Sequence, residues 1–581
     1  MRMGRIALTI AALSLSQPVI AAASDDFAEL LDEAWEWRLE NYPMFASRLG
    51  DDRYNDRWRD MSLDAIERRH EALSLFLRRL YAIDRSQLPE AEQLNYELFG
   101  RELQDDVDAH RFGGHLMPFS HLGGIQNLDN DTNYLSFNTQ KDYEGWLARL
   151  GKLNALIAQT IDLAERGRKS GLVPPTILMR RVPDQLSAQL VDAAADSPFY
   201  RIFETMPDTI DSMTQEQLQA AALETITKSV MPGYRKLASY FSKTYLPGCR
   251  DSIGLSALPN GNAWYEHVAR HFTTTAMTPD EIHRLGLNEV RRIRDEMQAI
   301  IDDLGFAGSF DDFLVHLRTN PDFYYDDPES LFTAYLATAK RIDPELVKLF
   351  GTLPRMPFGV KPIPDAIAPD TTTAYYTQPA ADGSRAGIYW VNLYRPEMRP
   401  KYEIEVLTAH EAMPGHHLQI ALQQELGALP NFRRFLGFTA FVEGWGLYSE
   451  SLGFDLGLYK DPYSRFGQLT YEMWRAVRLV VDTGIHYKGW TRQQAIDFFK
   501  DNAAKTEHDI VNEIDRYIGT PGQALAYKIG QLRIQALRDN ARRILGEEFD
   551  IRAFHDALLG GGALPLDILE RHMDTWLYSQ R

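Results

Sequence analysis

The sequence predicts a mainly α-helical fold that contains one small β element. Apolar residues recur at helical spacing from Asp25 to about Leu246 and again from Thr278 onward, as expected for amphipathic helices. Strand-like composition is confined to residues 371–392. With 581 residues, 44% of them hydrophobic, the chain is long enough to bury a large core and to form about two or three domains.

The first 23 residues have the pattern of a secretory signal peptide. Two arginines come first, residues 6–20 are apolar, and three alanines precede Ser24, which matches the basic, apolar and small-residue parts of such a signal. A membrane anchor needs about 20 apolar residues, whereas Gln17 and Pro18 interrupt this stretch. Because no cysteine follows it, we expect a cleaved chain without a lipid anchor, in the periplasm or outside the cell.

Charge and cysteine content exclude several classes of partner. The net charge of −19 argues against nucleic acids and anionic membrane surfaces, since both bind basic faces. The single cysteine, Cys249, excludes an internal disulfide bond and a cysteine-based zinc site. These properties make no prediction about the oligomeric state.

After the signal peptide (residues 1–23), we expect an N-terminal helical region, residues 24–250, and a second region, residues 251–581, that carries the functional site. The segment 246–261 is rich in proline and glycine, which favours a boundary there. Residues 112–138 contain Gly-Gly pairs and Asn-Asp runs. They predict a long surface loop that lines a cleft.

Local signals define further helices in the second region. Thr278 and Thr491 each begin a capping box, with Glu or Gln three residues later, and therefore predict helix starts. Another helix is predicted over residues 471–485, with His486 in the loop that follows.

A β-hairpin is predicted from residues 371–376 and 386–392, which have strand composition on either side of Asp382-Gly383-Ser384. Two interpretations of this hairpin stay open. One of its strands could pair with the backbone of an extended peptide, or the hairpin could simply cover the core.

Four charged or metal-binding side chains lie within eight positions: His410, Glu411, His416 and His417. A His-Glu pair followed by a second His is how one class of zinc hydrolases carries two ligands and a general base on one helix, with the histidines four residues apart. Here the spacing is two residues longer. On an unbroken helix, His416 would lie about 9 Å along the axis from His410 and about 120° around it, too far for both to bind one ion.

Pro414 and Gly415 could break the helix and so compensate for the two extra residues between the histidines. Proline removes a helical hydrogen bond and clashes with the carbonyl of His410, while glycine accepts the dihedral angles of a break. A break of two residues would return His416 to the position of the second ligand and leave His417 beside the ligands or against the substrate. The alternative is a Pro-Gly turn between two surface helices with incidental histidines.

Glu443 is the candidate third ligand. It lies in the apolar, small-residue segment 441–450, where an unpaired carboxylate would be costly to bury, and Gly444 and Gly446 allow a close approach. Two histidines and one glutamate leave the fourth position of a zinc ion open, which is the catalytic arrangement. The alternative is a partly exposed carboxylate at a helix end.

Four segments together resemble the bacterial family called domain of unknown function 885: HEAMPGHHLQ, FVEGWGLYSE, Asp482–His486 and Pro521–Gly530. More distantly, Gly-His after His-Glu, followed by Phe-Val-Glu, is similar to the thimet oligopeptidase family, and matching its Gly-His pair selects His416 over His417. The resemblance implies a large helical metallopeptidase-like fold with a deep substrate cleft, one Zn²⁺ ion per chain and hydrolysis of short peptides.

In this interpretation Glu411 is the general base, because a carboxylate beside a ligating histidine can face the reacting water. The oxyanion that forms on the substrate needs a hydrogen-bond donor, and the candidates in order of preference are Tyr527, Tyr517 and His486. A planar guanidinium suits a peptide's terminal carboxylate, and the candidates are Arg478, Arg533 and Arg538. Each of these six side chains has an ordinary packing or surface role as its alternative.

The predicted function is an exported zinc metallopeptidase that hydrolyses short peptides in the manner of a carboxypeptidase or an oligopeptidase. Two alternatives come from other classes of protein. A zinc-dependent amidase or esterase would keep the same ligands and act on non-peptide substrates. A non-catalytic helical binding protein of the periplasm would need no metal.

Overall fold

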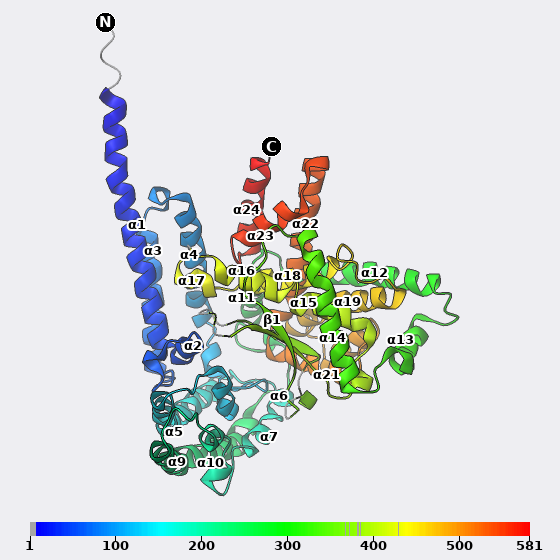
Figure 1. Ribbon diagram of the computed structural model, residues 1–581. Helices are drawn as coiled ribbons and strands as arrows, with labels where there is room; N and C mark the ends of the chain where they lie inside the picture. Colours follow the sequence, from blue (N-terminus) through cyan, green and yellow to red (C-terminus); the bar gives the residue numbers. More distant parts are fainter. Residues whose placement is uncertain are drawn as a thin grey trace. The chain divides into compact units, whose positions relative to one another are not determined.

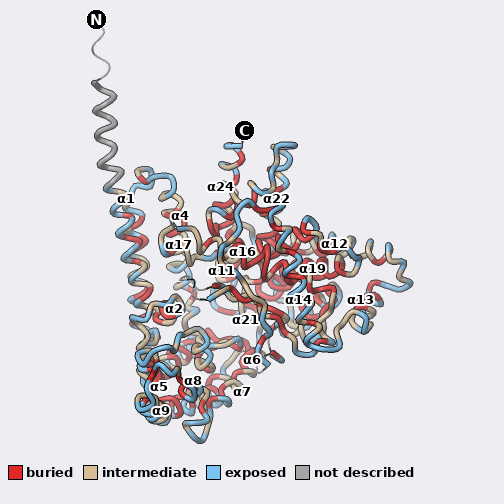
Figure 2. Tube along the Cα trace, viewed as in Figure 1, coloured by how far each residue is buried: buried red, intermediate tan, exposed pale blue. Residues whose placement is uncertain are grey.

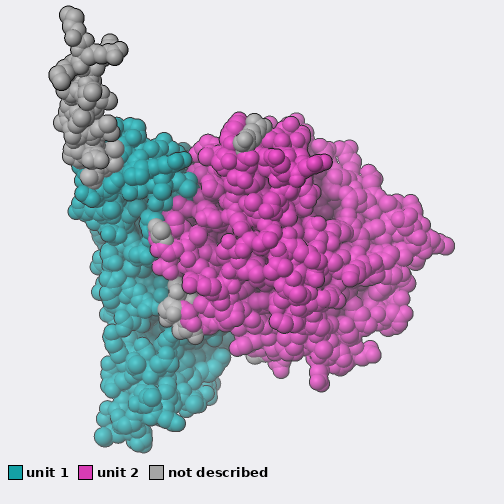
Figure 3. All heavy atoms as spheres, turned by 45° about the horizontal axis from the view of Figure 1, so that its top comes forward, with its two compact units in different colours: residues 1–252, 430–432 teal, residues 253–429, 433–581 magenta. Residues whose placement is uncertain are grey.

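The computed structural model describes residues 7–365, 368–370, 372–379, 383, 385–427 and 429–580. In these residues the chain is mainly helical, with one three-stranded sheet (Figure 1). The predicted helical fold with a small β element is therefore confirmed. The chain divides into two compact units, which are coloured separately in Figure 3. Unit 1 comprises Met1–Ser252 and Pro430–Phe432, and unit 2 comprises Ile253–Leu429 and Arg433–Arg581.

The predicted signal peptide begins outside the described residues, since residues 1–6 are not described. From Ala7 the chain is helical and continues to Asn41 as α1. Within the described part of the chain, none of the helices combines the length and the apolar character that a membrane crossing requires.

Unit 1 is built around the long helix α5 (Gln140–Ser170), which ends at Gly171 in the left-handed conformation. Its buried face includes Trp146, Leu150 and Ile157, at the three- and four-residue spacing that aligns side chains on one side of a helix. The other helices of this unit are α1, α2 (Pro43–Arg48), α3 (Leu63–Ala82), α4 (Glu90–His110), α6 (Thr176–Met179), α7 (Val182–Ser187), α8 (Arg201–Glu204), α9 (Ser212–Thr225) and α10 (Met231–Tyr240).

Residues 112–138 are irregular, as predicted, but some of their side chains are buried. The side chains of His121 and Gln126 are buried within unit 1, and residues Ile125–Tyr134 form 3₁₀ turns. Tyr234 of α10 donates its hydroxyl hydrogen to the Ile125 carbonyl at 2.8 Å. Most described residues of this segment are half-buried or exposed, so it lies largely at the surface as predicted, but long-range partners bury a few of its side chains.

Helix α19 (Pro462–His486) is the central helix of unit 2. Asp461 caps its first turn by accepting hydrogen bonds from the backbone N–H groups of Tyr463 and Ser464. From Phe466 onward almost every side chain of α19 is buried (Figure 2). The helix begins before the predicted start at residue 471, and His486 is its last residue rather than part of a loop.

The predicted capping boxes at Thr278 and Thr491 are confirmed, because they begin α12 (Pro279–Asp303) and α20 (Arg492–Lys500). The remaining helices are α11 (Gly261–Thr273), α13 (Phe310–Thr319), α14 (Pro328–Ile342), α15 (Ile404–Glu411), α16 (His416–Glu425), α17 (Asn431–Phe435), α18 (Thr439–Ser451), α21 (Glu507–Gly519), α22 (Ala526–Leu545), α23 (Ile551–Gly560) and α24 (Leu566–Ser579).

The sheet of unit 2 has the strand order β1-β3-β2. β2 (Ala374–Thr377) pairs antiparallel with β3 (Gly387–Val391), which confirms the predicted hairpin; residues 380–382 and 384 of its loop lie outside the described residues. β1 (Phe358–Pro362) pairs parallel with β3 and was not predicted. Pro362 in the strand, with Pro357 and Pro364 on either side of it, masks the strand pattern, yet proline is tolerated on an edge strand.

Candidate metal centre

The Pro-Gly break predicted between the two histidines is present. α15 ends at Glu411 and α16 begins at His416. A Cβ atom on Gly415 would lie 1.8 Å from the carbonyl oxygen of His410, so only glycine fits this turn. Trp445 of α18 donates its indole N–H to the Pro414 carbonyl at 2.8 Å and thereby ties the break to the next helix.

This break brings His410, His416 and Glu443 together. The Nε2 atoms of His410 and His416 lie 3.7 and 3.5 Å from Glu443 Oε2, and one ligand atom from each residue lies within 4.8 Å of the others. Among the described residues, no other group of three histidine, cysteine or acidic side chains offers ligand atoms this close together. Although burial opposes its charge, hydrogen bonds to both histidines hold the pKa of Glu443 well below its usual value.

His410 has a second carboxylate behind it. Its Nδ1 atom lies 2.8 Å from Glu450 Oε1, and Glu450 is fully buried. Burial lowers the pKa of His410, but Glu443 and Glu450 together outweigh burial and raise it to about 9. Metal-ligating histidines commonly donate their other ring N–H to such a carboxylate, which fixes the ring.

Glu450 was not predicted as part of the site. Its position seven residues after Glu443 is the signal that could have identified it, because residues two turns apart share one face of a helix. The pair therefore places one carboxylate on each side of the His410 ring.

Gly446 provides the room for the two imidazole rings. A Cβ atom at this position would lie 2.9 Å from His410 Nε2 and 3.1 Å from His416 Cε1. Gly444 serves a different contact, since its Cβ would lie 2.5 Å from the Cα atom of Gly530 in α22. Gly446 therefore allows the close approach of the two histidine rings, and Gly444 allows the close approach of the α22 backbone.

Glu411 lies next to this cluster at the end of α15, with its side chain half-buried. Burial raises the pKa of Glu411, and the nearby His410 and His416 only partly oppose that effect. Within the described residues, no hydrogen bond or ion pair engages its carboxylate. It is therefore a carboxylate at a helix end, open to water and poised to accept a proton.

His417 points to the sheet instead of the cluster. Its Nδ1 atom lies 2.8 Å from the hydroxyl of Tyr376 in β2, and its Nε2 atom lies 3.0 Å from the Met356 carbonyl. Burial lowers the pKa of His417 to about 4, so the ring is neutral. The geometry makes His417 a link between α16 and the sheet.

Tyr527 and Arg478 come together beside the cluster. The Tyr527 side chain is half-buried in α22, and its pKa is raised by burial and by the charge of Glu443. The guanidinium carbon of Arg478 lies 4.3 Å from the centre of the Tyr527 ring. Tyr517 is buried behind them, where its hydroxyl accepts hydrogen bonds from Arg478 Nε at 2.8 Å and from Trp474 Nε1 at 2.9 Å.

The other predicted site residues lie elsewhere. His486 is fully buried, with Nδ1 accepting from the Leu255 N–H at 3.0 Å and Nε2 3.0 Å from the Tyr517 carbonyl. Arg533 is partly exposed and forms a 3.2 Å ion pair with Glu570. Arg538 is buried, and it lies 3.3 Å from both the Tyr448 hydroxyl and the Asp455 carboxylate. These contacts are those of packing and surface residues.

The segment Asp482–His486 acts as a scaffold. Asp482 accepts hydrogen bonds from the Tyr265 hydroxyl at 2.5 Å and the Gly522 N–H at 3.0 Å. Burial raises the pKa of Asp482 to about 7. Because Gly522 precedes α22, Asp482 helps to place Tyr527.

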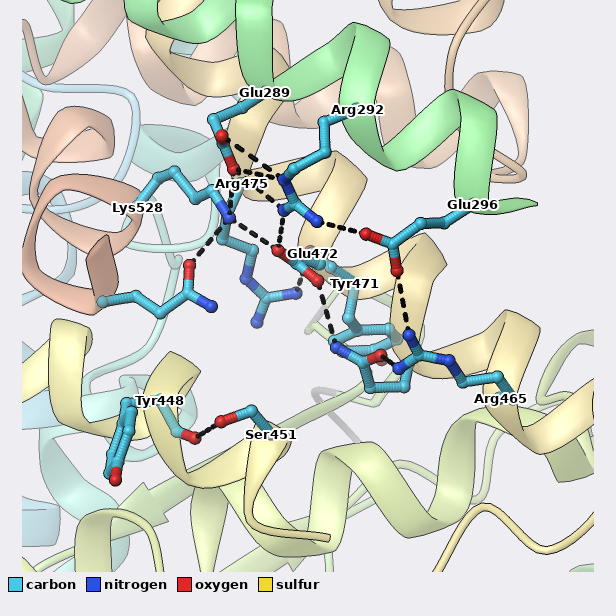
Figure 4. A network of polar contacts seen from close by, with 12 residues as sticks. Glu289, Arg292, Glu296, Tyr448, Ser451, Arg465, Tyr471, Glu472, Arg475 and Lys528 are labelled. Atoms are coloured by element: carbon cyan, nitrogen blue, oxygen red, sulfur yellow. Dashed lines mark hydrogen bonds and ion pairs between the residues drawn. The ribbon is translucent and has the colours of Figure 1, made fainter. Parts of the chain in front are cut away.

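A buried ionic network also fixes α22. Lys528 is fully buried and lies 2.7 Å from Glu472 of α19 and 3.0 Å from Glu289 of α12. Arg292 of α12 joins the same carboxylates (Figure 4). Breaking a buried pair leaves an uncompensated charge, so the network holds three helices together immediately after Tyr527.

The fold and the cluster define a class: a mainly helical protein with a His-His-Glu site and an adjacent half-buried glutamate. The chain belongs to the family of bacterial proteins of unknown function called DUF885, whose model matches residues 43–573. The family resemblance expected from the four sequence segments is therefore confirmed. No match is found among curated proteins.

Two solved structures are similar to the chain over nearly its whole length. A candidate lipoprotein from Colwellia psychrerythraea is 29% identical, with a TM-score of 0.89, covering 96% of this chain and 100% of its own. A candidate lipoprotein of unknown function from Shewanella oneidensis is 17% identical, with a TM-score of 0.74, covering 94% of this chain and 99% of its own. The second likeness concerns the fold alone.

Proposed function

We propose that this protein is an exported zinc-dependent metallopeptidase that hydrolyses short peptides. The observation that carries the proposal is the spacing of His410, His416 and Glu443, with nitrogen-to-oxygen distances of 3.7 and 3.5 Å. Two ligands about 2.1 Å from one ion at a tetrahedral angle lie roughly 3.4 Å apart. The three residues therefore fit one zinc ion, and a set of two nitrogens and one oxygen suits zinc better than calcium or magnesium.

A zinc ion bound there would polarise a substrate carbonyl and lower the pKa of a water molecule. Glu411 would accept the proton of that water and deliver it to the leaving amine. Tyr527 keeps its proton because its pKa is raised, and it donates a hydrogen bond to the oxygen on which negative charge develops. Glu450 holds the ring of His410 in its ligating orientation.

The sheet supports a peptide as the substrate. β2 is an edge strand. Its Tyr376 is hydrogen-bonded to His417, the second residue of α16. An extended peptide can add to such an edge through its backbone, which would lay it beside the helix that carries His416. A metallopeptidase-like cleft at this position is part of the proposal.

Export is proposed from the signal-like first 23 residues. The two similar structures are described as candidate lipoproteins, a class that is exported. The expectation that this chain has no lipid anchor stays a prediction.

The test compares the wild type with Glu411→Gln, measuring zinc content and cleavage of a mixture of short peptides. We expect about one zinc ion per chain in both proteins, and cleavage in the wild type alone. Absence of zinc from both would overturn the metal site and favour the periplasmic binding protein. Zinc in both without peptide cleavage would reject the peptidase and favour an amidase or esterase acting on other substrates.

A further inference from the structure

A cluster of cationic and aromatic side chains lies beside Tyr527. Trp474 and Arg478 come from α19, Glu513, Arg516 and Tyr517 come from α21, and Tyr527 comes from α22. We call these six residues the arginine–aromatic cluster. All belong to unit 2, which also contains the candidate metal centre.

The crossing of α18 and α22 places this cluster next to the metal ligands. The two backbones meet at Gly444 and Gly530, one residue after Glu443 and three residues after Tyr527. α19 flanks both sites as well, since Arg475 Nη2 lies 3.6 Å from Glu450 Oε1 and Arg478 follows one helical turn later.

Arg478 is held flat by its neighbours. Its guanidinium carbon lies 4.3 Å from the ring centre of Tyr527 and 4.8 Å from that of Trp474. Its Nε donates to the Tyr517 hydroxyl, and its Nη2 lies 3.2 Å from Glu513. A stacked guanidinium presents its edge to a planar anion such as a carboxylate.

One donor of this guanidinium is unused. Arg478 is only 4% exposed, yet its Nη1 atom has no hydrogen-bond partner among the described protein residues. An unsatisfied buried donor costs free energy. A ligand carboxylate that reached Nη1 would remove this cost.

The charges of the cluster favour an anion. Arg478 and Arg516 share a single carboxylate, Glu513, at 3.2 and 3.0 Å, so one positive charge is left over. The side chains of Trp474, Arg516 and Tyr527 are half-buried, so the cluster has an edge that is exposed to solvent.

We propose that Arg478 binds the free α-carboxylate of a peptide substrate, so that cleavage occurs close to the C-terminal end of the peptide. The inference rests on the proposed peptidase function and names the end of the substrate that the site reads. Arg478 positions the substrate, while Glu411 and Tyr527 face the reacting carbonyl. Of the three arginines considered from the sequence, the structure leaves Arg478 as the one beside Tyr527 with an unused buried donor.

The test measures binding without turnover, by calorimetry on zinc-loaded Glu411→Gln. The probes are an apolar pentapeptide with a free C-terminal carboxylate and the same peptide as its C-terminal amide. We expect the free acid to bind roughly 10- to 100-fold more tightly, the range for a charge-assisted hydrogen bond. Adding Arg478→Gln should remove this preference and Arg478→Lys should keep part of it. The control Arg533→Gln, at a partly exposed arginine paired with Glu570, should leave it intact.

Product analysis on the wild type completes the test. We expect fragments released from the C-terminal end, and slower cleavage of the amide. Equal binding of the acid and the amide to Glu411→Gln would overturn the inference, and this result needs no Arg478 variant. A preference for the acid that survives both Arg478 substitutions would also overturn it. Arg478-dependent preference without any cleavage by the wild type would instead reject the peptidase function and leave the carboxylate site standing.

Discussion

The two units differ in the groups that contact their buried cations. In unit 1, the fully buried Arg149 donates to neutral acceptors, the carbonyls of Arg57 and Tyr54 and the Ser47 hydroxyl, and burial lowers its pKa to about 10. In unit 2, several buried cations face carboxylates instead, as Lys528 faces Glu472 and Lys505 faces Glu403, although Arg433 donates to the Gly561 carbonyl.

This difference matters for the electrostatic environment that each unit offers to a ligand. Neutral acceptors hold a single cation in place without creating a field for a ligand. Paired charges on facing helices hold α22, which carries Tyr527, against α12 and α19, and so preorganise the polar surroundings of the candidate site. The paired charges thus lie in unit 2, the unit that also contains the candidate metal centre.

The strongest test of this contrast removes one histidine from each unit. His416→Ala takes away one of three metal ligands, so zinc affinity should fall by more than the roughly 10- to 100-fold that loss of a ligand's hydrogen-bond partner costs. His115→Ala in unit 1 should leave zinc affinity unchanged. Competition with a fluorescent chelator measures both values. Equal affinities in the two variants would show that the cluster is not the metal site.

The next largest effect is expected for Glu450→Gln. The amide can still reach His410, but it loses the negative charge that supports the imidazole as a ligand, so zinc affinity should drop roughly 10- to 100-fold. The matched control is Glu224→Gln, an exposed carboxylate of unit 1 paired with Lys228. Zinc affinity of Glu450→Gln at the wild-type level would contradict a role for the second carboxylate.

Glycine-to-alanine substitutions are expected to change the stability of the two units in opposite directions. Gly446→Ala in α18 would place a methyl group against both ligand rings, and we expect a loss of about 1–3 kcal/mol in the free energy of unfolding. Gly151→Ala in α5 meets no atom within 4 Å and should gain roughly 0.5–1 kcal/mol. Urea denaturation measures both changes; a Gly446→Ala protein as stable as the wild type would refute the close approach.

The smallest effect is a pH dependence in unit 1. The rings of His70 and His110 stack at 4.0 Å and those of His110 and His115 at 5.2 Å. Burial, and then the nearby His110, lower the pKa of His70 and His115. A lowered folded-state pKa stabilises the fold above the unfolded value of about 6.5, and this contribution is lost as the pH falls below it.

Urea unfolding between pH 7.5 and 5 checks this expectation, and the variant His110→Gln is the comparison. The wild type should lose more stability than the variant over this range, because removing His110 removes one source of repulsion. Identical pH profiles would show that the stack does not contribute.

Local sequence signals identified the parts of the molecule that depend on a few adjacent residues. The capping boxes at Thr278 and Thr491 and the break at Pro414-Gly415 lie where they were expected, because caps and prolines act within one or two helical turns. Glu443 was placed from its apolar setting and its distance along the chain from the His-Glu pair.

The rest depends on contacts between distant segments. The partner of His417 is 41 residues away in β2, and that of His410 is 40 residues away in α18. The buried position of Ile125 depends on a contact with Tyr234 of α10, and β1 pairs with the edge that β3 offers. Such pairings follow from tertiary packing, which residue patterns along the chain do not encode directly.

The contact between Gly444 and Gly530 acts as a pivot with a very short lever arm. When α18 tilts against α22 in thermal motion, an atom moves in proportion to its distance from the point of contact. Glu443 and Tyr527 lie one and three residues from that point, so a small tilt changes their separation less than it moves the outer ends of both helices. The spacing between the proposed metal ligand and the proposed hydrogen-bond donor therefore depends little on how the helix ends move.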